Sequence, residues 1–392
     1  MEGWAQIMAI DTNVSSDPME ILLSQLQAKS MGALWRMRIP QGAGDSLAAY
    51  PPMVWRWADV EPFAQRALEL VQPGRGEGER RAVTLDNPHT GGRGATHTLT
   101  AALQCVKPGD ISPSHRHVAA AIRFIIRGEG TVTIVNGEPA PMRPGDLVLT
   151  PSLYWHGHVS EGTGPMMWMD SLDAPLVGLL HVGMQQEPYP DEIEPATKPI
   201  SDSYNRFGIG HLRPVWEKSR SPVSPLLSFP WEQTERALHE LARSGASPFD
   251  DIAFEYTNPV TGGHVMPTMA CWIQMLRPGV HTKAHRHSSS QVFHVFRGQG
   301  ATIVDGVRLD WQQGDFFALA PYCWHEFINT SSSEEAVLFS TTDTAVLEPL
   351  NLYFEHQYEE NGGQQKVVAS YEERYASGNG YPQPAGRPDI RP

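Results

Sequence analysis

The 392-residue chain has few of the residues on which cross-linked, zinc-finger and nucleic-acid-binding proteins depend. Its three cysteines, Cys105, Cys271 and Cys323, are too few and too scattered for a disulfide framework or a zinc finger. Its 30 lysines and arginines are outnumbered by 44 aspartates and glutamates, and the net charge of −14 argues against nucleic-acid binding, which needs clustered basic side chains. We expect buried thiols in a reducing cytoplasm and no nucleic-acid partner.

Long apolar runs are also missing. The longest, such as residues 118–126, are short and are interrupted by Arg123, so we expect no membrane-spanning segment. The first residues lack the basic region and the apolar core of an export signal. What the chain does have is 40% hydrophobic residues, 35 glycines and 33 prolines, which is typical of a globular fold with many short strands and tight turns.

The pattern of residues changes several times along the chain. Residues 19–31 and 64–70 have helical spacing, and from about residue 80 short β-like runs alternate with Gly, Pro and Asn-Gly turns. Residues 231–243 again have helical spacing, and the polar residues at the end are expected to be loosely held. The sequence therefore predicts an N-terminal helical arm (1–79), a first β domain (80–187), a linker with a helix (188–249), a second β domain (250–357) and a polar tail (358–392).

The two β regions repeat each other. His-Arg-His occurs at residues 115–117 and again at 285–287, an offset of 170 residues. Trp-His occurs at 155–156 and again at 324–325, an offset of 169, so one residue is lost in a turn. Asn-Gly and Asp-Gly pairs, which favour tight hairpins, keep the same register. The repeat indicates two tandem copies of one antiparallel β unit.

The repeated histidines form a metal-binding pattern. A His-x-His pair on a strand places both imidazoles on one face, with Cα atoms about 7 Å apart, because side chains alternate along a strand. A third histidine after a hairpin can reach the same point from an adjacent antiparallel strand. Three neutral imidazoles suit Fe(II), Zn or Mn and leave coordination positions open for a substrate. The sequence predicts a metal site at His115, His117 and His156, with a second candidate site at His285, His287 and His325.

The spacing of these histidines resembles the two-part motif of the cupins, because G-x5-H-x-H starts at residue 109 and G-x5-P-x4-H starts at residue 145. The doubled motif resembles a bicupin. The resemblance implies an all-β core of two tandem cupin barrels, each a double-stranded β-helix or jelly roll, with an N-terminal helical arm. The glutamate that binds metal in many cupins would fall at Ala121, so the first site resembles a three-histidine cupin site without a carboxylate.

A narrower resemblance rests on the residues around the first motif. Residues 115–126, the segment Trp-His-Gly-His at 155–158 and the segment Trp-Met-Asp-Ser-Leu-Asp-Ala-Pro-Leu at 168–176 resemble the gentisate/salicylate 1,2-dioxygenase family, which includes 1-hydroxy-2-naphthoate dioxygenases. The likeness extends from about residue 80 to residue 354. It implies Fe(II)-dependent, extradiol-type insertion of O2 between the carboxyl- and hydroxyl-bearing carbons of an aromatic ortho-hydroxy acid, in the cytoplasm and by a homotetramer.

Three polar residues are expected beside the first metal. Arg123 shares a strand face with the metal histidines, and its buried guanidinium needs an anion, which is either the substrate carboxylate or an internal acid. The resemblance implies that His158 hydrogen-bonds substrate or bound oxygen and transfers a proton, the alternative being a packed histidine at the barrel rim. Asp170 would orient a ligand histidine or Arg123, the alternative being a carboxylate that caps a turn.

Other substrate contacts follow from the same resemblance. Gln104 could donate a hydrogen bond to substrate, although its repeat partner Gln274 leaves a structural role open. Arg80 and Arg81 resemble a family segment whose arginine reaches the substrate, and which of the two points inward stays open. Thr100 stands where many family members carry an aromatic residue, usually Trp, so gentisate, salicylate, a substituted salicylate and 1-hydroxy-2-naphthoate all remain candidate substrates.

The second repeat keeps the three histidines but changes their surroundings. Gln291 stands at the place of a ligand glutamate, and Phe293 stands where the first repeat has Arg123. We therefore expect this site to lack the arginine that clamps a substrate carboxylate and not to catalyse the reaction, and whether it holds a metal stays open. Two other functions are compatible with a bicupin, namely a metal-dependent isomerase or decarboxylase and a non-catalytic protein that binds aromatic acids. Arg123 together with Trp-His-Gly-His favours the dioxygenase.

Overall fold

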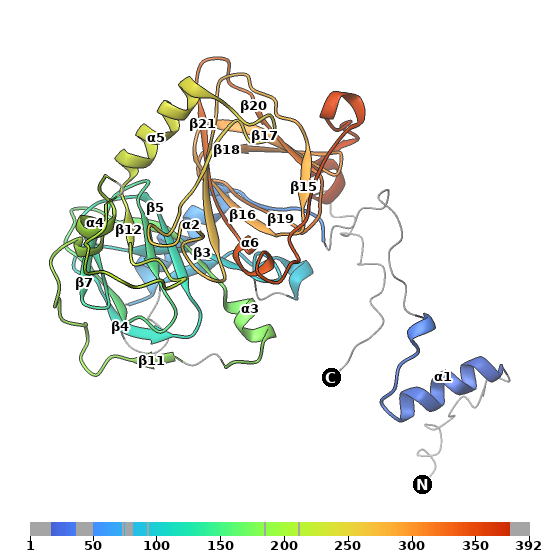
Figure 1. The fold of residues 1–392 in the computed structure, drawn as a ribbon, viewed down its shortest axis with the longest axis horizontal. Coiled ribbons are helices and arrows are strands. Elements are labelled where there is room, and N and C mark those ends of the chain that lie inside the picture. The colour runs from blue at the N-terminus through green and yellow to red at the C-terminus, as the bar shows by residue number, and fades with distance from the viewer. Residues whose placement is uncertain are drawn as a thin grey trace, which may run out of the picture. The chain divides into compact units, whose positions relative to one another are not determined.

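The computed structural model consists of two compact units, residues 1–45 and residues 46–392 (Figure 1). The first unit contains α1 (Pro18–Ala28) and the 3-10 helix η1 (Leu34–Arg36). Asp17 caps α1 by accepting a hydrogen bond from the backbone N–H of Met19. The residues that the structure describes are 17–36, 50–72, 74, 81–91, 94–183, 186–210 and 212–376.

The second unit is built from two β barrels, and each barrel consists of two mostly antiparallel sheets. This arrangement confirms the predicted all-β core of two tandem cupin barrels. The sheets of the first barrel have the strand orders β12-β8-β5-β10-β3-β2 and β11-β4-β9-β6-β7. The sheets of the second barrel have the orders β1-β19-β16-β21-β14-β13 and β22-β15-β20-β17-β18-β23.

The strands of the first barrel span about half of the unit. Their bounds are β2 (Ala82–Thr84), β3 (Thr100–Val106), β4 (Ile111–His117), β5 (Ala121–Arg127), β6 (Thr131–Val135), β7 (Glu138–Met142), β8 (Leu147–Thr150), β9 (His156–Ser160), β10 (Met166–Leu172), β11 (Gln186–Pro188) and β12 (Ser228–Phe229). Asn136 and Gly137 both have positive φ, 49° and 80°, as the two-residue hairpin between β6 and β7 requires.

The second barrel repeats this order. Its strands are β1 (Met53–Trp55), β13 (Ile252–Glu255), β14 (Ala270–Leu276), β15 (His285–His287), β16 (Gln291–Arg297), β17 (Gln299–Val304), β18 (Val307–Gln312), β19 (Phe316–Leu319), β20 (His325–Asn329), β21 (Ala336–Thr342), β22 (Glu355–Gln357) and β23 (Ala369–Ser370). The helices of the unit are α2 (Trp57–Leu70), η2 (Pro88–Thr90), α3 (Ala174–Leu179), α4 (Asp202–Phe207), α5 (Trp231–Ser244), α6 (Thr344–Leu347), η3 (Glu360–Gly363) and the π-helical turn η4 (Glu372–Ala376).

The two barrels share one hydrophobic core. The β5 and β10 strands of the first barrel are buried on both faces because the sheet that contains them packs against the second barrel. Phe124 of β5 stacks on Phe339 of β21 with ring centroids 4.1 Å apart. Ser171 and Thr341, equivalent residues of the two repeats, share a 2.9 Å hydrogen bond between their hydroxyl groups. The two barrels are therefore joined through one continuous core.

The segment before each barrel contributes a strand to the other barrel. The short strand β1 pairs with β19 of the second barrel, and β12 pairs with β8 of the first. The helices that follow are anchored in the same way, because Asp315 accepts from the backbone N–H of Trp57 and Asp146 accepts from that of Trp231, each at 2.8 Å. Figure 1 shows α5, in yellow, running between the barrels. The N-terminal arm is thus not wholly helical.

Two helices differ from their predicted bounds. The helix predicted at 19–31 is shorter, because α1 ends at Ala28. The prediction of a helix at 231–243 is confirmed by α5. The helix predicted at 64–70 begins earlier, because α2 starts at Trp57 and continues through Pro62. Proline removes one helix hydrogen bond, and burial of Val60, Ala64 and Leu68 against the core compensates for that loss.

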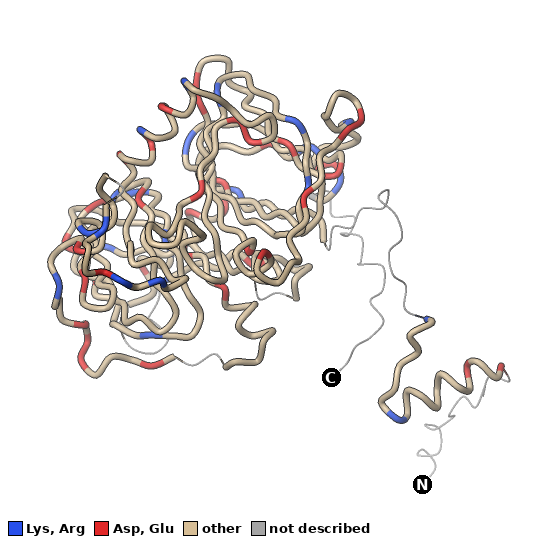
Figure 2. The backbone as a smooth tube through the Cα atoms, viewed as in Figure 1, with Lys and Arg blue, Asp and Glu red and all other residues tan. Residues whose placement is uncertain are grey.

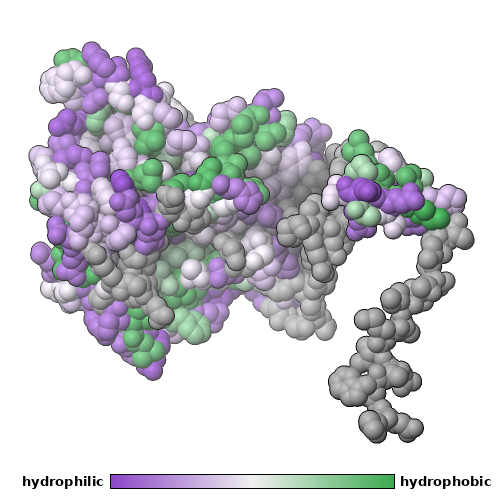
Figure 3. All heavy atoms as spheres, turned by 90° about the horizontal axis from the view of Figure 1, so that it is seen from below, coloured by the Kyte–Doolittle hydropathy of each residue, from purple (hydrophilic) through white to green (hydrophobic). Residues whose placement is uncertain are grey.

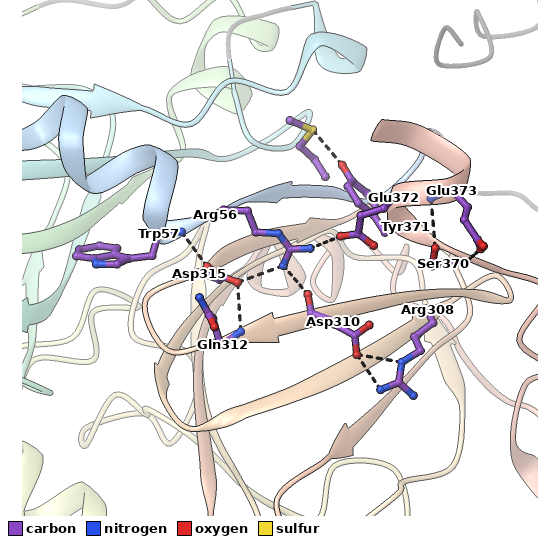
Figure 4. A network of polar contacts seen from close by, with 11 residues as sticks. Arg56, Trp57, Arg308, Asp310, Gln312, Asp315, Ser370, Tyr371, Glu372 and Glu373 are labelled. Carbon is purple, nitrogen blue, oxygen red and sulfur yellow. Dashed lines mark hydrogen bonds and ion pairs between the residues drawn. The ribbon is translucent and has the colours of Figure 1, made fainter. Parts of the chain in front are cut away.

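The expectation of a loosely held tail is wrong for its first part. Strand β23 pairs in parallel with β18, and Tyr371 is buried against the second barrel. Figure 4 shows Arg56 at the centre of a polar network that holds this segment: its guanidinium lies 2.6 Å from Glu372 and 3.2 Å from Asp315. The described residues after β22, up to residue 376, therefore pack on the second barrel.

The surface mixes charged, polar and apolar side chains. Lys and Arg are scattered among Asp and Glu along the tube in Figure 2. Apolar patches interrupt the hydrophilic surface in Figure 3, and the exposed large hydrophobic residues include Leu179 and Leu180 at the end of α3 and Leu350 and Leu352 after α6. In the part of the chain that the structure describes, every helix is too short or too polar to cross a bilayer. The three cysteines are free and buried, as expected.

Candidate active site

Two adjacent strands of the first barrel bring the three predicted histidines together. His115 and His117 lie on β4, and His156 begins β9, directly opposite His115 in the antiparallel register. One ring nitrogen from each imidazole lies within 4.8 Å of the other two. All three side chains are buried. The strand alternation that predicted this cluster is the cause of its geometry.

Backbone carbonyls fix the orientation of the three imidazoles. Each Nδ1 hydrogen-bonds the carbonyl oxygen of a residue two positions away, and the acceptors are Pro113 (2.9 Å), Ala119 (2.6 Å) and Tyr154 (3.0 Å). A carbonyl only accepts hydrogen bonds, so in a neutral imidazole the proton stays on Nδ1 and Nε2 remains the metal-binding nitrogen. Histidine ligands in metalloproteins are oriented in this way. The donor set therefore fits a transition-metal ion.

Burial keeps at least one of these imidazoles neutral. Desolvation lowers the pKa of His156 well below its usual value, and the positive charge of Arg123 lowers it further. A neutral imidazole is the form that binds metal, because the protonated ring has no lone pair to offer. The arginine beside the cluster thus helps to prepare it for a metal ion.

The cluster opens into a small polar cavity of about 20 Å³, which is room for roughly one water molecule. Besides the three metal histidines, its lining includes the predicted residues Gln104, Arg123, His158 and Asp170. These four side chains come from strands β3, β5, β9 and β10 and are buried. The structure therefore brings together seven residues that are up to 66 positions apart in the sequence.

Arg123 forms an ion pair inside this cavity. Its Nε lies 3.2 Å from Oδ1 of Asp170, which is its direct cross-strand neighbour on β10, and its Nη1 donates a hydrogen bond to Oγ1 of Thr150. The sequence left open whether Arg123 pairs with a substrate carboxylate or with an internal acid, and the structure shows Asp170 as the internal acid. Of the two partners considered for Asp170, the structure pairs it with Arg123.

His158 is held by a hydroxyl group. Its Nδ1 lies 2.9 Å from Oγ1 of Thr133, its neighbour on β6, and its ring packs 4.9 Å from the ring of Trp168. The side chains of His158 and His156 point to the same face of β9, so His158 lines the cavity beside the histidine cluster. Sequence analysis missed both supporting hydroxyls, Thr133 and Thr150, although the alternation of side chains along β6 and β8 could have indicated them.

The two arginines predicted to reach the substrate are Arg80 and Arg81. Arg80 lies outside the described residues. Arg81 is buried, lies 2.5 Å from Asp110 and donates from Nε to the carbonyl of Val71 at 2.9 Å. It is not among the residues that line the cavity. Its neighbour Ala82 is the β2 residue opposite Gln104, so the alternation of side chains turns Arg81 to the other face of the sheet. This structure gives Arg81 an internal ion pair in place of the expected substrate contact.

Two other expectations concern the size and the polarity of the pocket. Thr100 donates a hydrogen bond to the carbonyl of Leu172 at 3.4 Å and does not line the cavity, whereas the Leu172 side chain does. In the second repeat, Gln274 donates to the carbonyl of Asp250 at 2.8 Å and so holds the loop before β13 to β14. Gln104 differs from this partner because it faces the metal cluster.

Comparison with known proteins agrees with the fold. The Cupin domain family matches residues 102–172 and 272–342. The chain is 38% identical over 359 residues to 5-aminosalicylate 1,2-dioxygenase of Comamonas sp., covering 90% of this chain and 94% of that protein. It is 36% identical over 313 residues to 1-hydroxy-2-naphthoate 1,2-dioxygenase of Nocardioides sp. strain KP7, covering 78% of each.

A solved structure is similar along nearly the whole chain. The crystal structure of salicylate 1,2-dioxygenase from Pseudoaminobacter salicylatoxidans with gentisate superimposes with a TM-score of 0.79 at 32% identity, covering 88% of this chain and 95% of that one. The paired cupin barrels, the histidine cluster and these likenesses lead to one conclusion. The chain belongs to the gentisate/salicylate 1,2-dioxygenase family of ring-cleaving bicupin dioxygenases.

Proposed function

We propose that this protein is an Fe(II)-dependent, extradiol-type dioxygenase that inserts both atoms of O2 between the carboxyl- and hydroxyl-bearing carbons of an aromatic ortho-hydroxy acid. The substrate class comprises gentisate, salicylate, substituted salicylates and 1-hydroxy-2-naphthoate. One observation carries the proposal: three buried imidazoles with fixed tautomers share a small cavity with a buried guanidinium.

The histidine cluster supports one iron ion per chain in the first barrel. His115, His117 and His156 would hold it through Nε2, and no carboxylate from the usual cupin position takes part because that position is Ala121. Iron supplies the redox chemistry that lets O2 react with an electron-rich ring, which redox-silent zinc does not supply. Three protein ligands leave coordination positions for the two oxygen-bearing substituents of the substrate and for O2.

Arg123 is the proposed anchor for the substrate carboxylate. A buried guanidinium forms strong, charge-assisted hydrogen bonds with carboxylates, and Asp170 already orients its Nε. An aromatic acid is far larger than the single water molecule for which the cavity has room, so the side chains that line it must move when the substrate enters. Asp170 is proposed as a positioning residue that keeps the guanidinium directed at the substrate.

His158 is the proposed proton carrier. The Thr133 hydroxyl can accept a hydrogen bond from a protonated Nδ1 or donate one to an unprotonated Nδ1. His158 can therefore change tautomer without losing this partner, which lets its Nε2 release or take up a proton near neutral pH. Gln104 is proposed to donate its amide N–H to an oxygen of the substrate.

The remaining properties rest on the family and on the chain's composition. We propose a cytoplasmic location, which the three free and buried thiols support. We also propose a homotetramer, which the exposed apolar residues after α3 and α6 support. The molar mass from sedimentation equilibrium tests this assembly directly.

The test of function is O2 uptake by anaerobically iron-loaded protein. Gentisate, salicylate, 5-aminosalicylate and 1-hydroxy-2-naphthoate are offered separately, and O2 consumption is compared with the amount of ring-cleaved product. With at least one of these acids, we expect the protein to consume one O2 for each molecule of acid cleaved. We expect no O2 uptake by the His115→Ala variant. Iron-replete protein that consumes no O2 with any of them would refute the proposal.

A further inference from the structure

The second barrel carries a histidine cluster that the proposed reaction does not use. His285 and His287 lie on β15 and His325 begins β20, with one ring nitrogen from each within 4.8 Å of the others. Their ring centroids are 5.8, 4.4 and 5.0 Å apart, close to the 5.5, 4.3 and 4.9 Å of the first cluster. The scaffold thus repeats the metal-binding arrangement.

Backbone carbonyls also lie beside two of these imidazoles. The Nδ1 atoms of His287 and His325 lie 3.0 Å and 3.1 Å from backbone carbonyls, as in the first cluster. His287 is 4% exposed, and its Nε2 has no hydrogen-bond partner among the described residues. A buried polar nitrogen without a partner is costly, and a metal ion at the centre of the cluster would satisfy it.

A carboxylate lies next to this cluster. Oδ1 of Asp250 is 4.0 Å from Nε2 of His285. Two ligand atoms on one metal ion, each bonded at about 2.0–2.2 Å, are separated by at most about 4.4 Å, a limit that Asp250 meets with His285. The group of ligand atoms within 4.8 Å of one another consists of the three histidines, so the Asp250 side chain would move toward them on binding a metal. Asp250 comes from the loop between α5 and β13, not from the strand position of the usual cupin glutamate, which is Gln291 here.

The surroundings favour a cation over an aromatic acid. The cavity beside the cluster, about 270 Å³, is lined by the carboxylates of Asp250, Glu255 and Glu355, and its lining within the described chain contains no Lys or Arg. Phe293, stacked 4.6 Å from Phe317, stands in place of the arginine of the first site. Apart from the histidines, the charged side chains that line the cavity beside the second cluster are therefore all acidic, whereas the first cavity pairs Arg123 with Asp170.

We infer that the second barrel binds its own divalent transition-metal ion through His285, His287, His325 and the carboxylate of Asp250. Histidine nitrogens and carboxylate oxygens are both zinc ligands, and three imidazoles with one carboxylate give the four ligands of a tetrahedral zinc ion. The ion would tie the loop after α5 to strands β15 and β20 and would not take part in ring cleavage. This inference is independent of the proposed substrate.

The test counts metal ions in the full-length chain. Protein stripped by a chelator and reloaded with Zn²⁺ is analysed by mass spectrometry of the metal, and we expect two ions per chain in the wild type. His156→Ala and His325→Ala should each retain one ion. A wild-type chain that binds one ion, and loses it in His156→Ala, would overturn the inference.

A second measurement tests the fourth ligand without disturbing the core. In the His156→Ala background, Co²⁺ titration should give the absorption bands of a four-coordinate ion, and Asp250→Asn should weaken Co²⁺ binding at least tenfold. Glu355→Gln removes the same charge from the same cavity and is the matched control, with a smaller effect. Equal Co²⁺ affinity with and without Asp250→Asn would contradict the assignment of Asp250, and the absence of Co²⁺ binding in folded His156→Ala would contradict the site.

Discussion

The two barrels hold nearly superimposable imidazole clusters in opposite surroundings. In the first barrel, the neighbours of the cluster are Arg123, His158 and Asp170. At the equivalent register positions, the second barrel has Phe293, Phe327 and Ser340. The comparison indicates that the fold places three histidines close together in each barrel. A few side chains behind those histidines decide whether an anionic aromatic acid can bind there.

The side chains behind the two histidine clusters also differ in how they affect the free energy of unfolding. A buried ion pair such as Arg123–Asp170 loses hydration that its mutual attraction only partly restores, and an apolar set of similar volume is often as stable or more stable. The second barrel has such an apolar set, in which Phe293 stacks on Phe317 and packs 5.6 Å from Phe327. The first barrel retains the costlier polar network, which is the expectation for a site that binds and transforms a substrate.

The largest expected contrast comes from matched ligand changes in the two barrels. His115→Ala removes one of the three first-barrel ligands and should reduce ring cleavage by at least about 100-fold, since even loss of a residue behind the ligands costs about 10–100-fold. His285→Ala should retain most of the O2 uptake while lowering the zinc content. We would measure the initial rate and the metal content of both variants. Equal losses of activity in the two variants would contradict this prediction.

The carboxylate anchor is the next largest effect. Arg123→Lys keeps the charge but loses the planar fork, so the KM for the aromatic acid should rise by about 10–100-fold, the equivalent of 1.5–3 kcal/mol for a charge-assisted hydrogen bond. Arg277→Lys is the control in the second barrel. Arg277 forms an ion pair with Asp251, with 2.6 Å between the two charged groups, and this pair does not belong to the first site. A KM within twofold of wild type in Arg123→Lys would argue against the anchor.

A smaller effect is expected from the threonine behind His158. Thr133→Val keeps the shape and removes the hydroxyl partner of Nδ1, so kcat should fall by about fivefold, for roughly 1 kcal/mol of lost hydrogen bonding, and its pH profile should shift. The equivalent change, Thr302→Val, removes the acceptor of the Trp311 indole N–H, which is 3.0 Å away. That variant should lower the melting temperature and leave the pH profile of kcat in place. Identical pH profiles in the wild type and in Thr133→Val would contradict the proton-carrier role.

The smallest effect is a pH-dependent stability confined to the second barrel. His264 lies between Glu255 and Glu348, and hydrogen bonding to these carboxylates raises its pKa above 6.5. Because the folded pKa is the higher one, the stabilisation is complete below pH 6.5 and is lost as pH rises through the folded pKa. His264→Gln should therefore destabilise the protein by about 1 kcal/mol at low pH and by nearly nothing at high pH.

Thermal unfolding at pH 5.5 and pH 9 measures this last effect. A difference between wild type and His264→Gln that stays constant over this pH interval would show that protonation of His264 does not contribute.

Much of the site could be predicted because it follows the two-residue period of β-strands. His115, His117 and Arg123 are separated by even numbers of residues or lie on facing strands, so their common direction is visible in the sequence. The repeat offset of about 170 residues then predicted the second cluster without further information.

The parts that could not be predicted depend on contacts between distant or very short segments. Strands β1 and β12 have three and two residues, too few to show any periodicity, so their exchange between barrels had no sequence signal. Asp250 lies 35 residues before His285, and nothing local in the sequence relates the two. The pairing of Arg81 with Asp110 likewise became evident only from the register of β2 against β3.

The central claim is that the first barrel, and not the second, cleaves the aromatic ring with O2. The most direct measurement is a reaction of the iron-loaded protein with isotopically labelled O2, followed by mass spectrometry of the product. We predict a ring-opened product that carries both labelled oxygen atoms, formed by His285→Ala but not by His115→Ala. A product with no label or one labelled atom, or one formed equally well by His115→Ala, would contradict the account.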